Sequence, residues 1–148
     1  MQNIKQSQID LLQVILANTT SAMKISKTLS EHSPDKVLKG DEIICGLIYR
    51  LMVPMTDEEI SISMNEAEDI IYHDESSDED EFNEDEIIDD KEDSILTKKV
   101  RTNNCNCNIC SQVRVCLLNF MDFIPKDELG DKFKSSIIET CKTYNKII

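Results

Sequence analysis

The chain has 148 residues, enough for one domain or for a small domain with a tail. It lacks Trp and has only three Gly and three Pro, which argues against a many-stranded β protein and favours helices. The net charge is −13, but residues 74–93 hold thirteen acidic residues against one lysine, so the remainder is close to neutral and lacks the excess of basic charge that strong nucleic-acid binding needs.

The first predicted helix spans residues 4–30, where apolar residues recur at helical spacing. The Asn-Thr-Thr-Ser run at 18–21 is a poor helix interior, so this segment is either one helix or a pair broken there. The same region lacks a basic segment followed by a continuous apolar one, and we expect no signal peptide. No segment has the roughly twenty apolar residues of a membrane span, so we expect no membrane insertion.

A second helix is expected at about 35–53, ended by Pro54. Ser33 is suited to cap this helix, and Pro34 to occupy its first position. Gly46 inside the helix costs about 1 kcal/mol relative to Ala, which predicts that another helix approaches closely there.

Thr56, with acidic residues through Glu59, has the pattern of a capping box and opens a third helix. The predicted buried face of that helix consists of Ile60, Met64, Ala67 and Ile71. Residues 74–93 are expected to be disordered or an exposed linker, because mutual repulsion of the carboxylates opposes compaction.

The C-terminal third is predicted to begin with a short extended piece at 95–100 and a cysteine loop at 103–108. Two helices should follow, at 109–123 and 131–145, with a turn between them.

The predicted fold class is therefore all-α: an irregular bundle of about five helices with a disordered acidic insert and a Cys-rich loop. We divide the chain into an N-terminal helical part at 1–73, an acidic disordered linker at 74–94 and a C-terminal Cys-rich helical part at 95–148. Whether the two helical parts share one core stays open.

Half of the six cysteines lie in one short segment, as Cys105, Cys107 and Cys110. Clustered cysteines in a reducing compartment are metal ligands or redox groups more often than structural disulfides. A closed zinc site needs four ligands. We predict Cys141 as the fourth, on a helix that folds back antiparallel, and we expect His32 to lie far from the cluster.

Two other uses of the cluster stay open. The first is a thiol redox protein, in which Cys107 and Cys110 would form the reactive pair with Cys105 as resolving thiol, although the strand-before-helix setting of thioredoxin-like proteins is missing. The second is a zinc-dependent transcription module.

The sequence contains no complete catalytic signature. It has no P-loop, no G-x-G-x-x-G and no nucleophile elbow, so we predict no enzyme, with thiol redox activity as the main enzymatic alternative.

The acidic tract is either a solvated linker or a docking arm for a basic protein partner. Ser76 and Ser77 precede a run of acids and resemble an acidophilic kinase site of the casein-kinase-2 type. Phosphate there would add about −1.5 to −2 charges per site and strengthen such an arm.

Two segments carry a resemblance to a group of proteins. The stretches 41–59 and 105–110, together with the 131–148 helix, resemble small uncharacterised proteins of nucleocytoplasmic large (giant) DNA viruses that infect amoebae and algae. The resemblance implies an intracellular protein of the infected cell, in the host cytoplasm, the viral factory or the virion. It implies no activity and no catalytic residues.

These observations predict a non-enzymatic viral interaction or structural and regulatory protein. A zinc-stabilised cysteine cluster would hold its C-terminal part together, and the acidic arm would bind a basic protein partner. We expect no strong nucleic-acid binding, and the oligomeric state is left open.

Overall fold

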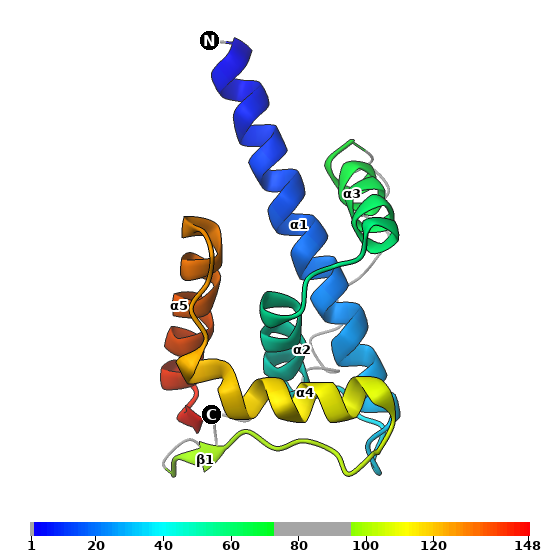
Figure 1. Cartoon of the computed structure of the whole chain (residues 1–148), viewed down its shortest axis with the longest axis vertical. Coiled ribbons are helices and arrows are strands. Elements are labelled where there is room, and N and C mark those ends of the chain that lie inside the picture. Colours follow the sequence, from blue (N-terminus) through cyan, green and yellow to red (C-terminus); the bar gives the residue numbers. More distant parts are fainter. Residues whose placement is uncertain (1, 73–95) are drawn as a thin grey trace, which may run out of the picture. The chain divides into compact units, whose positions relative to one another are not determined.

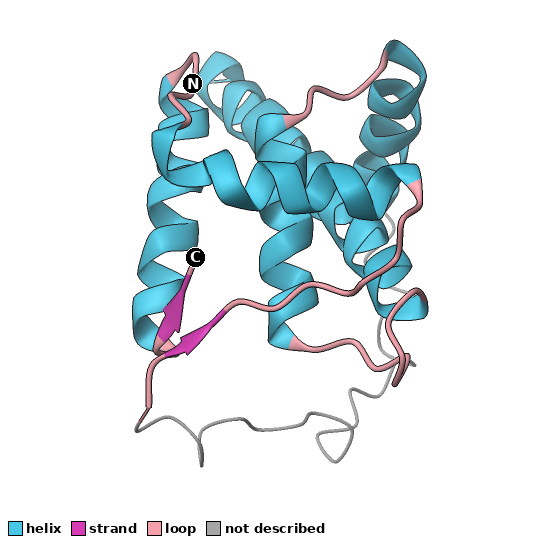
Figure 2. Cartoon of the chain, turned by 60° about the horizontal axis from the view of Figure 1, so that its bottom comes forward, coloured by secondary structure: helices cyan, strands magenta, loops and turns pink. Residues whose placement is uncertain are grey.

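The computed structural model describes residues 2–72 and 96–148, with side chains from residue 5 onward. Almost all of their regular secondary structure is helical (Figures 1 and 2), so the predicted all-α class with five helices is confirmed for this part of the chain. The predicted acidic insert lies outside the described residues. None of the described helices carries an apolar stretch of the length that crossing a bilayer requires. The elements in chain order are α1 (Gln2–Glu31), α2 (Gly40–Met52), α3 (Asp57–Tyr72), β1 (Lys98–Lys99), α4 (Asn108–Asn119), the 3-10 turn η4 (Phe120–Asp122), α5 (Glu128–Thr143) and β2 (Lys146–Ile147).

Packing divides the described residues into two compact units. Unit 1 contains residues 2–21 and 55–72, and unit 2 contains residues 22–54 and 96–148, so that α1 contributes to both. The apolar face of α2 packs against α4 and α5, so helices from both predicted helical parts contribute to the core of unit 2.

Helix α1 continues without a break through the polar run at 18–21. The amide Nδ2 of Asn18 donates to the carbonyl of Val14 at 2.9 Å, and the hydroxyl of Thr19 donates to the carbonyl of Ile15 at 2.9 Å. Because these side chains bond one turn back along the helix, they do not compete for its main-chain hydrogen bonds. The alternative of a broken pair is therefore excluded.

Helix α2 begins at Gly40, five residues later than predicted. The hydroxyl of Ser33 lies 2.7 Å from the carbonyl oxygen of Ser30 and 3.0 Å from a carboxylate oxygen of Asp35, and its one proton is donated within this pair of acceptors. Ser33 thus completes the end of α1 and does not cap α2, and the prediction for Ser33 and Pro34 was wrong. A side-chain oxygen suited to capping can serve the helix before it as well as the one after it.

Two helix signals between α2 and α3 are confirmed. Helix α2 ends at Met52, ahead of Pro54. The hydroxyl of Thr56 accepts a hydrogen bond from the main-chain N–H of Glu59 at 3.2 Å, which caps α3 as predicted.

The predicted buried face of α3 is confirmed in part. Ala67 is buried and Met64 and Ile71 are half-buried, as predicted. Ile60 is 42% exposed, and Ser63 is buried in its place. Within unit 1, the side-chain amide of Gln13 donates to the carbonyl of Met64 at 3.0 Å, so α1 and α3 approach closely. Such an approach needs small side chains between the two helices and leaves the larger ones outside.

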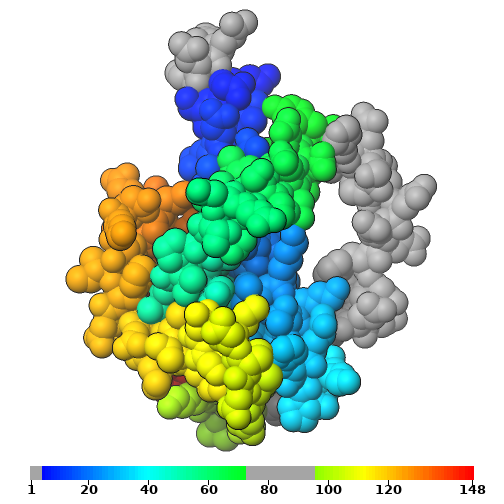
Figure 3. All heavy atoms as spheres, turned by 45° about the vertical axis from the view of Figure 1, so that its right-hand side comes forward, coloured from blue at the N-terminus to red at the C-terminus, as the bar shows by residue number. Residues whose placement is uncertain are grey.

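Unit 2 has the main apolar core, formed by α2, α4 and α5 with Leu29 of α1 and Val100 of the loop after β1. In Figure 1, α4 runs across α2, and buried side chains of α4 face this core. Figure 3 shows that α4 (yellow) has its other face open to solvent, where Val115 and Leu118 are 58% and 80% exposed. The fully buried side chains of α4 and η4 are those of Cys110, Val113 and Phe120.

Gly46 of α2 faces α1 inside unit 2. A Cβ atom at this position would lie 2.6 Å from the carbonyl oxygen of Ala22 and would overlap the hydroxyl of Ser26. The predicted close helix approach at Gly46 is therefore confirmed, and α2 packs there backbone to backbone.

A short parallel strand pair joins the two ends of the C-terminal part. The main-chain N–H of Lys98 donates to the main-chain carbonyl of Asn145 at 2.9 Å, and that of Val100 donates to the main-chain carbonyl of Ile147 at 2.8 Å. The extended piece at 95–100 was predicted, but its partner was not, because a two-residue strand leaves no periodic pattern. Helix α5 accordingly ends at Thr143.

Candidate metal centre

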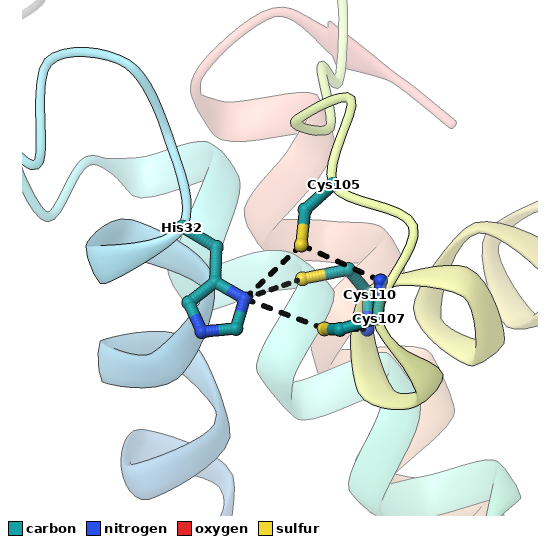
Figure 4. A group of neighbouring side chains, drawn as sticks. All are labelled: His32, Cys105, Cys107 and Cys110. Atoms are coloured by element: carbon teal, nitrogen blue, oxygen red, sulfur yellow. Dashed lines mark hydrogen bonds between the residues drawn. The ribbon is translucent and has the colours of Figure 1, made fainter.

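Four side chains of unit 2 converge at one point, between the end of α1 and the start of α4 (Figure 4). Cys105 lies in the loop before α4, Cys107 is the N-cap residue of α4, and Cys110 lies in its first turn. His32 comes directly after α1. The four ligand atoms all lie within 4.8 Å of one another.

The imidazole of His32 faces the three sulfurs through one nitrogen. Its Nδ1 atom lies 3.3 Å from the sulfurs of Cys105 and Cys107 and 3.4 Å from that of Cys110, while the other ring nitrogen points away (Figure 4). Two ligands of a tetrahedral zinc ion, at Zn–S of about 2.3 Å and Zn–N of about 2.0 Å, would lie about 3.6 Å apart. These four residues are therefore positioned to hold a metal ion.

Each of the three sulfurs accepts one N–H hydrogen bond. The sulfur of Cys105 accepts from the main-chain N–H of Cys107 at 3.4 Å, and that of Cys107 from the main-chain N–H of Cys110 at 3.5 Å. The sulfur of Cys110 accepts from the side-chain amide of Asn103 at 3.3 Å. Cys107 thereby takes the place that an oxygen-bearing side chain usually has at a helix N-cap, so the helix start itself orients the cluster.

The hydrogen bonds and burial push two thiol pKa values in opposite directions. The N–H of Cys110, and further bonds within the cluster, lower the pKa of Cys107 to about 6. Burial raises the pKa of Cys110 to about 11, against the lowering effect of the Asn103 amide. In the metal-free protein Cys107 thus ionises more readily than Cys110.

The sequence prediction of the ligand set is corrected at one position. Cys105, Cys107 and Cys110 lie together as predicted, but Cys141 is not among the four. It is buried in α5, at 4% exposure, where it belongs to the apolar core of unit 2. Burial raises the pKa of its thiol, as expected for a cysteine that packs as a small apolar side chain.

His32 was expected to lie far from the cluster, and that expectation was wrong. A continuous α1 and the turn stabilised by Ser33 bring the end of the helix to the loop before α4. No spacing rule indicates the pairing, because 73 positions separate His32 from Cys105. The available signal was the scarcity of histidine: the chain has two, and one directly follows a predicted helix.

The remaining cysteines behave as core residues. Cys45 and Cys116 are buried, and burial raises the pKa of Cys45 to about 12. All six cysteines are free thiols in the structure.

No protein-family model, curated protein or solved structure matches this chain. Its function is therefore inferred from the geometry of the candidate metal centre and from the sequence.

Proposed function

We propose that the chain binds one structural zinc ion through Nδ1 of His32 and the sulfurs of Cys105, Cys107 and Cys110. The observation that carries the proposal is the convergence of four suitable ligand atoms within 4.8 Å. The N–H donors on all three sulfurs support it as well, since they stabilise thiolates. Four protein ligands would close the coordination sphere, which is typical of structural sites and not of catalytic ones.

The donor set favours zinc among the biological metals. Thiolate and imidazole donors in a tetrahedral arrangement suit Zn²⁺, whereas Mg²⁺ and Ca²⁺ prefer oxygen ligands. Iron–sulfur clusters are held by four cysteines in most proteins, and here the fourth donor is an imidazole.

The proposed ion would fasten two segments that are remote in the sequence. Three ligands come from one loop and helix start, and the fourth comes from the end of α1. Metal binding would therefore contribute to the folding free energy of unit 2, because the unfolded chain does not hold the four ligands together. The zinc would therefore have a structural role, holding the end of α1 against the start of α4.

Native mass spectrometry of the full chain, purified with zinc and a reductant, tests this proposal. We expect one zinc ion per chain, its removal by a strong chelator, and a loss of helicity by circular dichroism on removal. Re-addition of zinc should restore both. A folded, metal-free chain from a zinc-replete, reducing preparation would contradict the proposal.

Thiol redox chemistry is a second candidate, favoured by the lowered pKa of Cys107. Its thiolate would attack a small disulfide such as oxidised glutathione and release one glutathione thiol. A neighbouring cluster thiol would then displace the second glutathione and close a protein disulfide, so that two protein thiols are oxidised and one disulfide is reduced. Disulfides confined to residues 105–110, formed in chain that purifies without metal, would support this candidate. Equal reaction of all six cysteines would exclude it.

We further propose that the acidic tract binds a basic protein partner. The support is the sequence itself, with thirteen acidic residues and one lysine at 74–93. The resemblance to proteins of giant DNA viruses suggests the cytoplasm of an infected cell as the setting. Binding of a lysine-rich peptide should weaken steeply with salt and should be lost when the acids of 78–93 are changed to their amides. Unchanged binding by that variant would contradict the proposal.

One observation favours the alternative of a zinc-dependent transcription module, which is a weaker candidate than the structural zinc site. The described residues of unit 2 include fourteen basic and nine acidic side chains, so the unit carries a net positive charge. Ion pairs join Lys39 to Asp35, Lys142 to Glu139 and Lys146 to Asp41 and so offset part of this charge. Salt-dependent binding of a DNA duplex by the zinc-loaded chain would support this alternative.

A further inference from the structure

Asn103 makes four hydrogen bonds around the candidate metal centre. Its amide Nδ2 donates to the carbonyl of Leu29 at 3.1 Å and to the sulfur of Cys110 at 3.3 Å. Its Oδ1 accepts from the N–H of Cys105 at 3.1 Å, and its main-chain carbonyl accepts from Arg114 at 3.0 Å. One residue thus joins α1, the cysteine loop and α4.

The side-chain contacts of Asn103 match the chemistry of a primary amide. Both N–H groups are used as donors, and the oxygen is used as an acceptor. An aspartate has no donor, and a serine has a single hydroxyl, so neither can make all three bonds. The bond to Leu29 also satisfies one of the last carbonyls of α1, which have no partner within the helix.

The bond from Asn103 differs from the other two N–H bonds to sulfur. Those two come from the main chain of the cysteine segment itself. The donor to Cys110 is a side chain, and Cys110 is 1% exposed, so water cannot take its place. The thiolate of Cys110 therefore depends on Asn103 for its hydrogen bond.

We propose that Asn103 is the positioning residue of the zinc site: it stabilises the Cys110 thiolate and holds the end of α1 where His32 reaches the metal. Leu29, to which it is bonded, precedes His32 by three residues. This inference rests on the proposed zinc function. Groups around a metal that orient its ligands contribute about 10- to 100-fold to affinity.

The test compares Asn103→Asp and Asn103→Ser with Asn104→Ser, a matched change at an exposed neighbour. Asp and Ser can both still accept the N–H of Cys105 and so preserve the local turn, but they lose both amide donors. Each full-length chain is titrated anaerobically with Co²⁺, whose sulfur-to-metal absorption reports on the thiolates. Zinc competition then gives the zinc affinity.

We expect both Asn103 variants to bind zinc about 10- to 100-fold more weakly than wild type. Their sulfur-to-cobalt band should move to longer wavelength, because a thiolate without its hydrogen bond gives up electron density more easily. Asn104→Ser should match wild type in both measurements. If Asn103 only supported the fold, its substitution would leave the sulfur-to-cobalt band of the fully loaded protein at the wild-type wavelength.

Two results would overturn the inference. One is a wild-type affinity and band position in Asn103→Ser. The other is a loss confined to Asn103→Asp, which would show that added negative charge, and not the missing hydrogen bond, weakens binding. If the wild-type chain binds neither Co²⁺ nor Zn²⁺, the zinc function itself fails, and with it the role of Asn103.

Discussion

The Nδ1 atom of His32 lies 3.3 Å from the sulfur of Cys107, although 75 positions separate the two residues. One is at the end of α1, and the other caps the start of α4. Three of the four clustered residues come from one short segment, and His32 comes from a remote part of the sequence. A metal ion bound by all four would therefore join two parts of the fold, whereas one bound by the three cysteines alone would only organise a loop.

We expect His32→Ala to lower the zinc affinity of the full chain by more than about 100-fold, because losing a group that merely orients a ligand already costs about 10- to 100-fold. Cys141→Ala should retain one zinc ion per chain, since that sulfur is buried in the core. Competition against a chromophoric chelator measures both affinities, and circular dichroism checks that the variants fold. Retention of zinc by His32→Ala and its loss from a folded Cys141→Ala would restore the ligand set predicted from the sequence.

Alkylation of the metal-free protein should distinguish Cys107 from the core cysteines. Its pKa is lowered to about 6, below the ordinary thiol value, so the thiolate fraction rises through pH 6 and is nearly complete at pH 8. The pKa of Cys45 is raised to about 12, so that this thiol should stay protonated and unreactive over the same range.

Iodoacetamide labelling followed by peptide mass spectrometry, from about pH 5 to about pH 10, gives the rate at each cysteine. A midpoint near pH 6 at Cys107 is the expected result. Zinc should suppress labelling of the cluster and leave the core cysteines unaffected. A midpoint near pH 9 at Cys107 would show that the N–H bonds to its sulfur do not persist without metal.

Gly46→Ala should destabilise the protein by about 1–3 kcal/mol, because the added methyl group overlaps α1 at Ala22 and Ser26. Gly40→Ala is the matched control in the same helix, since a Cβ atom there would meet nothing from elsewhere in the described chain within 4 Å. That control should be neutral or stabilising by up to about 1 kcal/mol. Urea unfolding measures both free energies, and equal stability of the two variants would contradict the close approach of α1 and α2.

Asp41→Asn should destabilise unit 2 by about 1–3 kcal/mol. Its carboxylate forms an ion pair with Lys146 at 3.0 Å and accepts the N–H of Arg101 at 3.2 Å, with 15% of the side chain exposed. Asp41 thereby connects the start of α2 to β2 and to the loop after β1.

The control for Asp41 is Glu139→Gln, which removes an ion pair to Lys142 with 72% of the glutamate side chain exposed. Solvent screens that pair, so we expect a change within about 0.5 kcal/mol. Urea unfolding at low and moderate salt compares the two variants. A stability loss at Glu139 as large as that at Asp41 would show that burial does not distinguish the two pairs.

Local chemistry in the sequence was enough to predict much of this protein. Apolar periodicity predicts the helices, Pro54 and Thr56 predict the boundary between α2 and α3, and the cysteine spacing predicts three of the four clustered ligands. Gly46 predicts a close helix approach, although not its partner. Each of these signals acts over a few residues, where the chain itself sets the geometry.

The tertiary structure alone decided which residue joins the three cysteines and how the described residues divide into units. The local sequence around Cys141 or His32 does not show which of the two lies beside the three cysteines. Only the packing shows that Cys141 is buried in α5 and that His32, after the end of α1, lies at the cluster. The same holds for the small contact residues of α3 and for the pairing of β1 with β2. Contacts across 50 or more positions depend on which faces bury the most apolar surface together, and that is a property of the whole fold.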